Sequence, residues 1–327
     1  MPTVLRRLHF VCLAGVAALV VAGVGVCAQS YPSKPVRLVV PFTAGGGTDI
    51  AARIVGRKLS EELGVSVVID NRGGAGGTVG TDLVARALPD GYTLAMVSGS
   101  HSINPGLYRS LPYDTVRSFA AITQVVLAPG VLVVHPALGA RSVRELIDLA
   151  RARRGELSYA SAGRGTPPHL AMELLKSVTG TAFVHVPYKG SSAMIPDLLG
   201  GQIAATIPSI PAVLPLVKAG RLLALAVTSR ARSAAAPEVP TMIEAGVPDY
   251  EASSWYGLLA PAATPPAIIE RLHRASVQSL RANDIRERLI EQGLDPVGNT
   301  PQQFAAVINE EITRWRRVIN ASGGAIE

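Results

Sequence analysis

The sequence predicts an α/β protein of two lobes, each a mainly parallel sheet flanked by helices. Short apolar runs of strand length alternate with helical patterns from Val36 to Val227. The run Val36–Val40 is continuously apolar, which is typical of a strand buried on both faces. The alternation starts a second time after residue 126, so the 327 residues divide into two domains of ordinary size.

The first lobe opens with repeated strand–helix–strand units. We expect helices over 49–63 and 78–87, each lying between two strands. The strands are predicted at Val36–Val40, Val65–Ile69 and Tyr92–Val97. Because a helix separates consecutive strands, this order predicts parallel neighbours with helices on both faces of the sheet.

The second lobe repeats this design. Ser142 and Glu145 form a capping box that starts a helix. Its strands are predicted at Val131–Val134, Leu157–Ala160, Phe183–Val186, Ile203–Ile207 and Leu223–Val227. We therefore expect a second sheet flanked by helices.

The last third of the chain has a different pattern, with one strand at Trp255–Ala260 followed by helices. These helices are expected to begin near Thr264, Asp284 and Thr300, the last running to about Ile319. They have no sheet of their own, so we expect them to pack on the first lobe.

This arrangement requires the chain to cross between the lobes twice, near 125–130 and near 250–256. The first lobe would comprise residues 29–127 and 254–327, and the second lobe residues 128–253. Two crossings form a hinge with a cleft between the lobes.

The N-terminus has the features of a secretory signal peptide over residues 1–28. Arg6 and Arg7 precede the apolar run Phe10–Val26, and small residues allow cleavage after Ala28. We therefore expect a periplasmic protein. A lipid on Cys27 and an uncleaved membrane anchor are the alternatives.

Composition excludes several classes of protein. Both cysteines lie in the predicted leader, so the mature chain would have no disulfide, thiol catalyst or cysteine metal site. Loss of Arg6 and Arg7 leaves 29 basic and 24 acidic residues, a net charge of +5. The basic residues are dispersed, which argues against nucleic acid, whereas a mild positive field favours a small anionic ligand.

A glycine-rich loop, Pro41 to Asp49, follows the first buried strand and precedes a helix. Its glycines let the backbone approach a ligand, and the free N–H groups of the first helical turn attract an anion. The alternative is a turn that merely reverses the chain. The candidate ligand-binding residues here are Thr43, Ala44, Gly45, Gly46, Thr48 and Asp49.

The second lobe has a counterpart loop, Ser161 to His169, between a strand and a helix with prolines in its first turn. Its glycines and Thr166 are expected to present N–H and hydroxyl donors. His169 either orients the loop or packs in the core. The candidate residues are Ser161, Gly163, Gly165, Thr166 and His169.

Three further candidates, Ser98, His101 and Tyr188, follow strand ends, where open α/β sheets bind ligands. A third glycine-rich loop, Asn71–Gly80, lacks the glycine spacing of a dinucleotide site and the G-K-[ST] of a P-loop. We expect that loop to form a tight turn into its helix.

Catalysis has no support in the motifs. The chain has neither G-x-S-x-G nor H-E-x-x-H, and its histidines lack metal-ligand spacing. We expect no catalytic residue, no metal and no cofactor. An α/β enzyme using the same cleft would need a nucleophile and a base within hydrogen-bonding reach.

Several stretches, in order along the chain, carry a family resemblance. They are PFTAGGGTDIAAR, NRGGAGG, LPDGYTL, NPGLYRSLPYD, SAGRGTPPHLAMELL, HVPYKGSSAMIPDLLGGQ, EVPTMIEAG, SSWYGLLAPAATP and INEEITRWRRVI. The chain resembles the extracytoplasmic solute receptors of the tripartite tricarboxylate transporter family, the Bug-type receptors.

The resemblance implies a two-lobed periplasmic binding protein, a type II-like flytrap. Such a receptor holds a small organic carboxylate and delivers it to membrane permease subunits. It also implies that the loops Thr43–Asp49 and Ser161–His169 hold the ligand carboxylate, partly through water. We expect a monomer. A sensory receptor of the same fold that signals to a kinase is the alternative.

The chain departs from the family pattern at a few positions. Gly73 and Ala121 stand where the family usually has proline, and acidic residues common near Ala204 and Pro208 are missing. An acidic residue there would pair with a ligand amino group, so we expect a non-amino carboxylate as the ligand.

Overall fold

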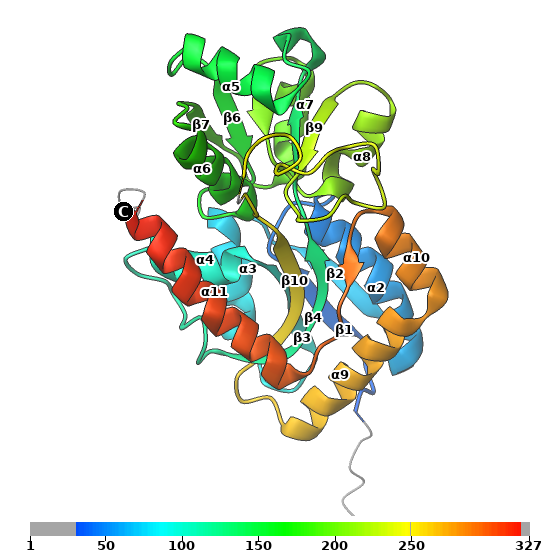
Figure 1. Cartoon of the computed structure of the whole chain (residues 1–327). Helices are drawn as coiled ribbons and strands as arrows, with labels where there is room; N and C mark the ends of the chain where they lie inside the picture. The colour runs from blue at the N-terminus through cyan, green and yellow to red at the C-terminus, as the bar shows by residue number, and fades with distance from the viewer. Residues whose placement is uncertain (1–30, 249, 322–327) are drawn as a thin grey trace, which may run out of the picture. The chain divides into compact units, whose positions relative to one another are not determined.

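The computed structural model describes residues 31–248 and 250–321 (Figure 1). The chain from Lys34 onward forms one compact unit. The predicted signal peptide, residues 1–28, lies outside the described residues. Within the described residues, no helix is both long and apolar enough to cross a bilayer.

The first sheet has six strands in the order β11-β4-β10-β3-β1-β2. They are β1 (Val36–Val40), β2 (Val67–Asn71), β3 (Thr93–Ser98), β4 (Phe119–Ala128), β10 (Ser254–Pro261) and β11 (Asp295–Pro296). β1 pairs in parallel with β2 and β3, whereas β10 is antiparallel to β3 and β4, and β11 to β4. The sheet is therefore mixed.

The second sheet has five strands in the order β7-β6-β8-β5-β9. They are β5 (Val131–Val134), β6 (Ser158–Ser161), β7 (Val184–Pro187), β8 (Ala205–Thr206) and β9 (Leu223–Val227). β6 is parallel to β7 and β8, whereas β5 is antiparallel to β8 and β9. β5 is the first strand after the chain passes from the first sheet to the second, and β10 is the first strand after it returns. Neither is preceded by a helical crossover within its own sheet, so neither is constrained to be parallel.

Helices cover both faces of the first sheet (Figure 1). One group is α2 (Gly47–Leu63), α9 (Pro266–Arg281) and α10 (Asn283–Glu291); the other is α3 (Thr78–Ala85), α4 (Ser100–Leu107) and α11 (Pro301–Ala321). α9 and α11 both contact β4, which confirms that the C-terminal helices pack on this sheet. α11 begins near Thr300, as predicted, with a capping box in which Gln303 N donates to Thr300 Oγ1 (3.2 Å) and Thr300 N to Gln303 Oε1 (3.0 Å).

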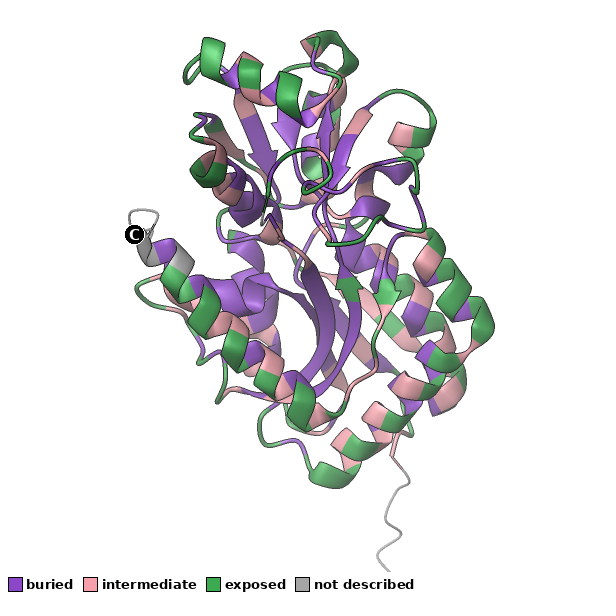
Figure 2. Ribbon diagram, in the orientation of Figure 1, coloured by how far each residue is buried: buried purple, intermediate pink, exposed green. Residues whose placement is uncertain are grey.

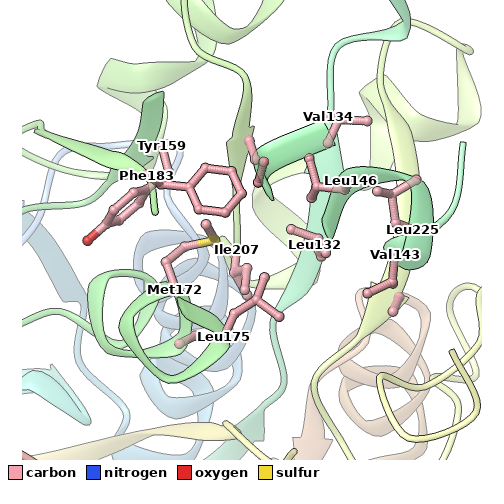
Figure 3. Packing of buried hydrophobic residues seen from close by; sticks show 14 of the residues in the cluster. Leu132, Val134, Val143, Leu146, Tyr159, Met172, Leu175, Phe183, Ile207 and Leu225 are labelled. Carbon is pink, nitrogen blue, oxygen red and sulfur yellow. The ribbon is translucent and has the colours of Figure 1, made fainter. Parts of the chain in front are cut away.

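Four helices accompany the second sheet: α5 (Val143–Ala152), α6 (Pro167–Thr179), α7 (Ser191–Leu199) and α8 (Ile210–Lys218). The predicted cap of α5 is present, because Glu145 N donates to Ser142 Oγ at 3.2 Å. Buried side chains of α5 and α6 meet those of β5, β6 and β9 in one core, including Leu132, Leu146 and Met172 (Figure 3). Figure 2 shows the buried strands and the exposed outer faces of the helices.

The chain passes between the two sheets twice, from β4 to β5 and from β9 to β10. Hydrogen bonds join the two passages, because Gly130 N donates to Thr228 Oγ1 (2.7 Å) and Thr228 N donates to Gly130 O (2.9 Å). Within the second passage, Ala252 N donates to Thr228 O (3.1 Å). The two passages therefore lie side by side at Gly130 and Thr228 and form a narrow connection.

Candidate ligand-binding site

A cavity of about 50 Å³ lies where the ends of the two sheets meet the connection between them. It is lined by Gly46, Thr48 and Ser98 from the first sheet and its helices, and by Thr166 and Ser191 from the second. Since one water needs roughly 10–15 Å³, the cavity has room for a few waters or a small ligand group.

Four helices begin at this cavity. The lining includes the N-cap residues of α2, α6 and α8, which are Gly46, Thr166 and Ser209, and the first residue of α7, Ser191. Helix N-termini carry partial positive charge and unpaired N–H groups. None of the described residues that line the cavity is Asp, Glu, Lys, Arg or His. The cavity therefore presents helix dipoles and neutral hydrogen-bond donors to an anion, and no charged side chain among the described lining residues repels the anion or competes for it.

The start of α2 has free donors. Gly46 provides no side-chain cap, and the first intrahelical bond runs from Ile50 N to Gly46 O at 3.0 Å. The N–H groups of Gly47 and Thr48, which both line the cavity, precede this bond. A carboxylate at this position would meet them directly.

The Asp49 side chain holds the same loop in place through hydrogen bonds outside the cavity. Its Oδ2 accepts from Gly45 N (2.8 Å) and Arg53 Nε (2.9 Å), and its Oδ1 accepts from Asn71 Nδ2 (3.1 Å). Burial raises the pKa of this carboxyl, but the hydrogen bonds from Arg53, Gly45 and Asn71 outweigh burial and leave the pKa below its ordinary value. Asp49 is thus a charged anchor for the loop and does not line the cavity.

The start of α6 differs from the prediction. The N–H groups expected as ligand donors are used inside the loop: Gly163 N donates to Ser161 Oγ (3.2 Å), Gly165 N to His169 Nδ1 (3.3 Å) and Thr166 N to Gly163 O (3.3 Å). The next two residues are prolines, which have no N–H. The Thr166 hydroxyl also donates within the loop, to Gly163 O at 2.6 Å. This side of the cavity therefore presents mainly the apolar rings of Pro167 and Pro168 in place of amide donors.

The glycine-rich loops of the two sheets contact each other beside the cavity. A Cβ added at Gly165 would lie 2.6 Å from Leu107 Cδ1 and 2.7 Å from Asn104 Oδ1 of α4. One added at Gly76, in the short helix η1 (Ala75–Gly77), would lie 2.5 Å from Arg164 O. The third glycine-rich loop thus supports the contact between the two sheets, because its glycines allow this close approach.

Of the residues predicted to bind ligand, Gly46, Thr48, Ser98 and Thr166 line the cavity. Thr43 lies across from α7, with its Oγ1 2.7 Å from Ser192 Oγ, and Ala44 and Gly45 are exposed. The Tyr188 hydroxyl donates to Asp197.

The predicted histidines and Ser161 have structural contacts. His101 packs against Phe119 and its Nε2 lies 3.0 Å from Thr115 O; burial lowers its pKa to about 4. His169 stacks on His185 at 4.3 Å, and His185 Nε2 lies 2.7 Å from Ser161 Oγ. Both imidazoles therefore hold the loop that precedes α6, since His169 Nδ1 also accepts from Gly165 N. Direct ligand contact by these residues stays a prediction.

Sequence reasoning missed several lining residues. The most important are Ser209 at the start of α8, and Ser254 and Tyr256 on β10. Trp255, between the last two, faces the opposite side of the sheet and packs edge-on against Phe304 at 5.1 Å. The alternation of side chains along a strand is the signal that places Ser254 and Tyr256 on the face opposite this tryptophan.

The Tyr256 hydroxyl lies between residues that the two sheets contribute to the cavity. Burial raises the pKa of its phenol to about 12, and the hydroxyls of Ser209 and Thr48 limit the rise. A Cβ added at Gly47 would lie 2.5 Å from the Tyr256 hydroxyl and would overlap the Ser209 hydroxyl. Hydroxyls from both sheets therefore converge at the start of α2.

Comparison with known proteins identifies the family. Residues 51–323 match the tripartite tricarboxylate transporter family receptor. The chain is a member of this family. It is 41% identical to the protein BugT of Bordetella pertussis (strain Tohama I), over 97% of this chain and 96% of BugT.

Solved structures of the family have the same fold. R. palustris Rpa4515 with adipate is 40% identical, with a TM-score of 0.88 over 90% of this chain and 99% of Rpa4515. MatC from Rhodopseudomonas palustris with bound malate is 30% identical, with a TM-score of 0.84 over 88% of this chain and 99% of MatC. This receptor is thus a two-lobed binding protein of the TctC and Bug type. No group of three His, Cys, Asp or Glu residues in the described part of the chain is arranged to hold a metal ion.

Proposed function

We propose that this receptor captures a small organic carboxylate in the periplasm and delivers it to permease subunits of a tripartite tricarboxylate transporter. The observation that carries the proposal is the uncharged cavity at which α2, α6, α7 and α8 begin. Helix starts and hydroxyls bind a carboxylate well, because the bound charge meets fixed donors with no counter-charge to displace. The adipate and malate held by two relatives are ligands of this class.

Binding is proposed to close two lobes, residues 29–127 with 254–327 and residues 128–253, about the double connection at Gly130 and Thr228. Contacts between the two sheets outside the cavity support this. Leu170 of α6 packs against Ile103 and Trp315 from helices of the first sheet. Such contacts would form on closure and add to the affinity of the closed state.

Export as a monomer with cleavage after Ala28 completes the proposal. Delivery requires only that the permease recognise the closed form, so no chemical step is needed at the site.

A thermal-shift screen of the mature chain against adipate, malate and other small organic acids tests the carboxylate proposal. A true ligand raises stability by about 2.7 kcal/mol when its concentration is one hundred times Kd. Putrescine, a diammonium of comparable length, is the control and is expected to give no shift. Stabilisation by putrescine with none by any carboxylate would refute the proposal.

A further inference from the structure

We propose that Ser254 receives a second oxygen group of the ligand, so that the receptor selects short acids with an oxygen function at their far end and no ammonium group. This inference rests on the proposed carboxylate-binding function and names the ligand class of the same cavity.

Ser254 has an unused hydroxyl in the cavity wall. The residue is 8% exposed and lines the cavity, and its Oγ has no hydrogen-bond partner among the described residues. A buried hydroxyl without a partner is unfavourable, so a polar atom that fills the cavity gains from pairing with it. Serine hydroxyls both donate and accept, which suits a carboxylate or a hydroxyl group.

Ser254 lies away from the place where hydroxyls converge on α2. A Cβ added at Gly99 would lie 2.8 Å from Ser254 Oγ and 3.5 Å from Pro167 Cγ, which places Ser254 at the starts of α4 and α6. Tyr256, two residues along the same face of β10, reaches instead to Ser209 and Thr48 at the starts of α8 and α2. Residues two apart on a strand are roughly 7 Å apart, so the cavity has two polar ends separated by a short distance.

The remaining lining residues indicate the chemistry of the rest of the ligand, both the chain between its two polar ends and the group at its far end. Pro167, Pro168, Ala171 and Ile207 are apolar and suit a short carbon chain. A buried ammonium group needs a carboxylate partner, and no acidic residue is among the described residues lining the cavity. Glu311 lines a smaller pocket that also borders Ser254, but its carboxylate already accepts from Arg314 Nη1 (3.2 Å) and Trp315 Nε1 (2.5 Å). The ligand therefore has a carboxylate at the α2 end and an oxygen function, not an amino group, at Ser254.

The test compares acids that differ only in the far group. The probes are succinate with butanoate, glutarate with pentanoate, and adipate with hexanoate, each titrated calorimetrically into the wild type, Ser254→Ala and Ser191→Ala. In the wild type the best diacid is expected to bind about 10-fold or more tightly than its monoacid, the effect of one hydrogen bond to a charged group. Ser254→Ala should remove most of that preference and leave the monoacid unchanged.

Ser191→Ala is the matched control. Ser191 lines the same cavity at the opposite end, where its Cβ lies 4.0 Å from a Cβ added at Gly46. Its loss should weaken the diacid and the monoacid by the same factor. Ser254→Cys, which keeps the size of the side chain but donates weakly, should behave like Ser254→Ala. The cysteine variant thus distinguishes loss of the hydrogen bond from loss of side-chain volume.

Other results overturn the inference. A diacid preference that survives in Ser254→Ala, or a wild type that prefers the monoacids, would show that Ser254 does not receive the far group while leaving carboxylate binding intact. Tight binding of aspartate or glutamate with no binding of the diacids would also overturn it. If no acid binds the wild type in the thermal-shift screen, the proposed function fails as well.

Discussion

Leu170 offers a direct test of lobe closure, because it belongs to a helix of one sheet and packs on helices of the other. The residue is 4% exposed, and its neighbours are Ile103 and Leu107 of α4 and Trp315 and Ile319 of α11. It does not line the cavity. If the lobes separate without ligand, this contact is lost in the open receptor and regained on binding.

The size of the effect follows from the area that Leu170 buries. Leu170→Ala removes about three carbon atoms at roughly 0.8 kcal/mol each, or about 2.4 kcal/mol. Since 1.4 kcal/mol is about tenfold in Kd, the variant should bind adipate, the probe, roughly 50-fold more weakly. The free energy of unfolding of the unliganded protein should change by less than about 1 kcal/mol, because an exposed leucine contributes little.

Leu175 is the matched control on the same helix. It is 1% exposed and lies in the core of the second sheet, with Leu132 and Met172 (Figure 3). Leu175→Ala should lower the free energy of unfolding by about 2–5 kcal/mol and leave the Kd for adipate unchanged. Urea denaturation and calorimetric titration of both variants measure the two quantities.

Closure of the lobes is refuted if the two variants show the same changes in affinity and stability. In particular, a Leu170→Ala protein with wild-type affinity and reduced stability would mean that the contact persists without ligand. The two sheets would then be fixed against each other, and the ligand would enter without closure.

Two further predictions concern the start of α2 and the buried histidines. Gly47→Ala should weaken adipate binding roughly 5- to 100-fold, because the added methyl overlaps the Ser209 hydroxyl. Gly46→Ala, whose methyl would have only ordinary contacts of 3.5 Å and longer, should weaken binding less than Gly47→Ala, and equal losses in calorimetry would contradict this prediction. Burial lowers the pKa of His101 and of His169 from 6.5 to about 4, so the unfolded chain takes up protons first. Stability is thus complete above pH 6.5 and declines as the pH falls toward 4, by on the order of 2 kcal/mol per group at pH 5. Thermal melting at pH 7.5 and 5 measures this; His101→Gln should reduce the decline, and melting temperatures equal at both pH values would refute it.

Much of the fold follows from local sequence. β1, β5 and β9 have the predicted bounds, because each is a short continuous apolar run next to a polar or glycine-rich turn. α4 is a helix that the local pattern does not predict, because Gly99 and Pro105 both disfavour a helix there. Packing against α11 stabilises it. The antiparallel direction of β10 has no local signal, because it is set by partners more than a hundred residues away.

The candidate site divides along the same line. Gly46, Thr48 and Thr166 were found because a strand, a small-residue loop and a helix start are adjacent in sequence. Ser209, Ser254 and Tyr256 were missed because each becomes part of the cavity only when two sheets and a connection meet. This division has a consequence for selectivity. The start of α2 offers backbone N–H groups, which a side-chain substitution leaves in place, whereas Ser254 offers a hydroxyl that a substitution removes. We therefore expect substitution of Ser254 to change ligand preference most readily, while the start of α2 still binds the carboxylate.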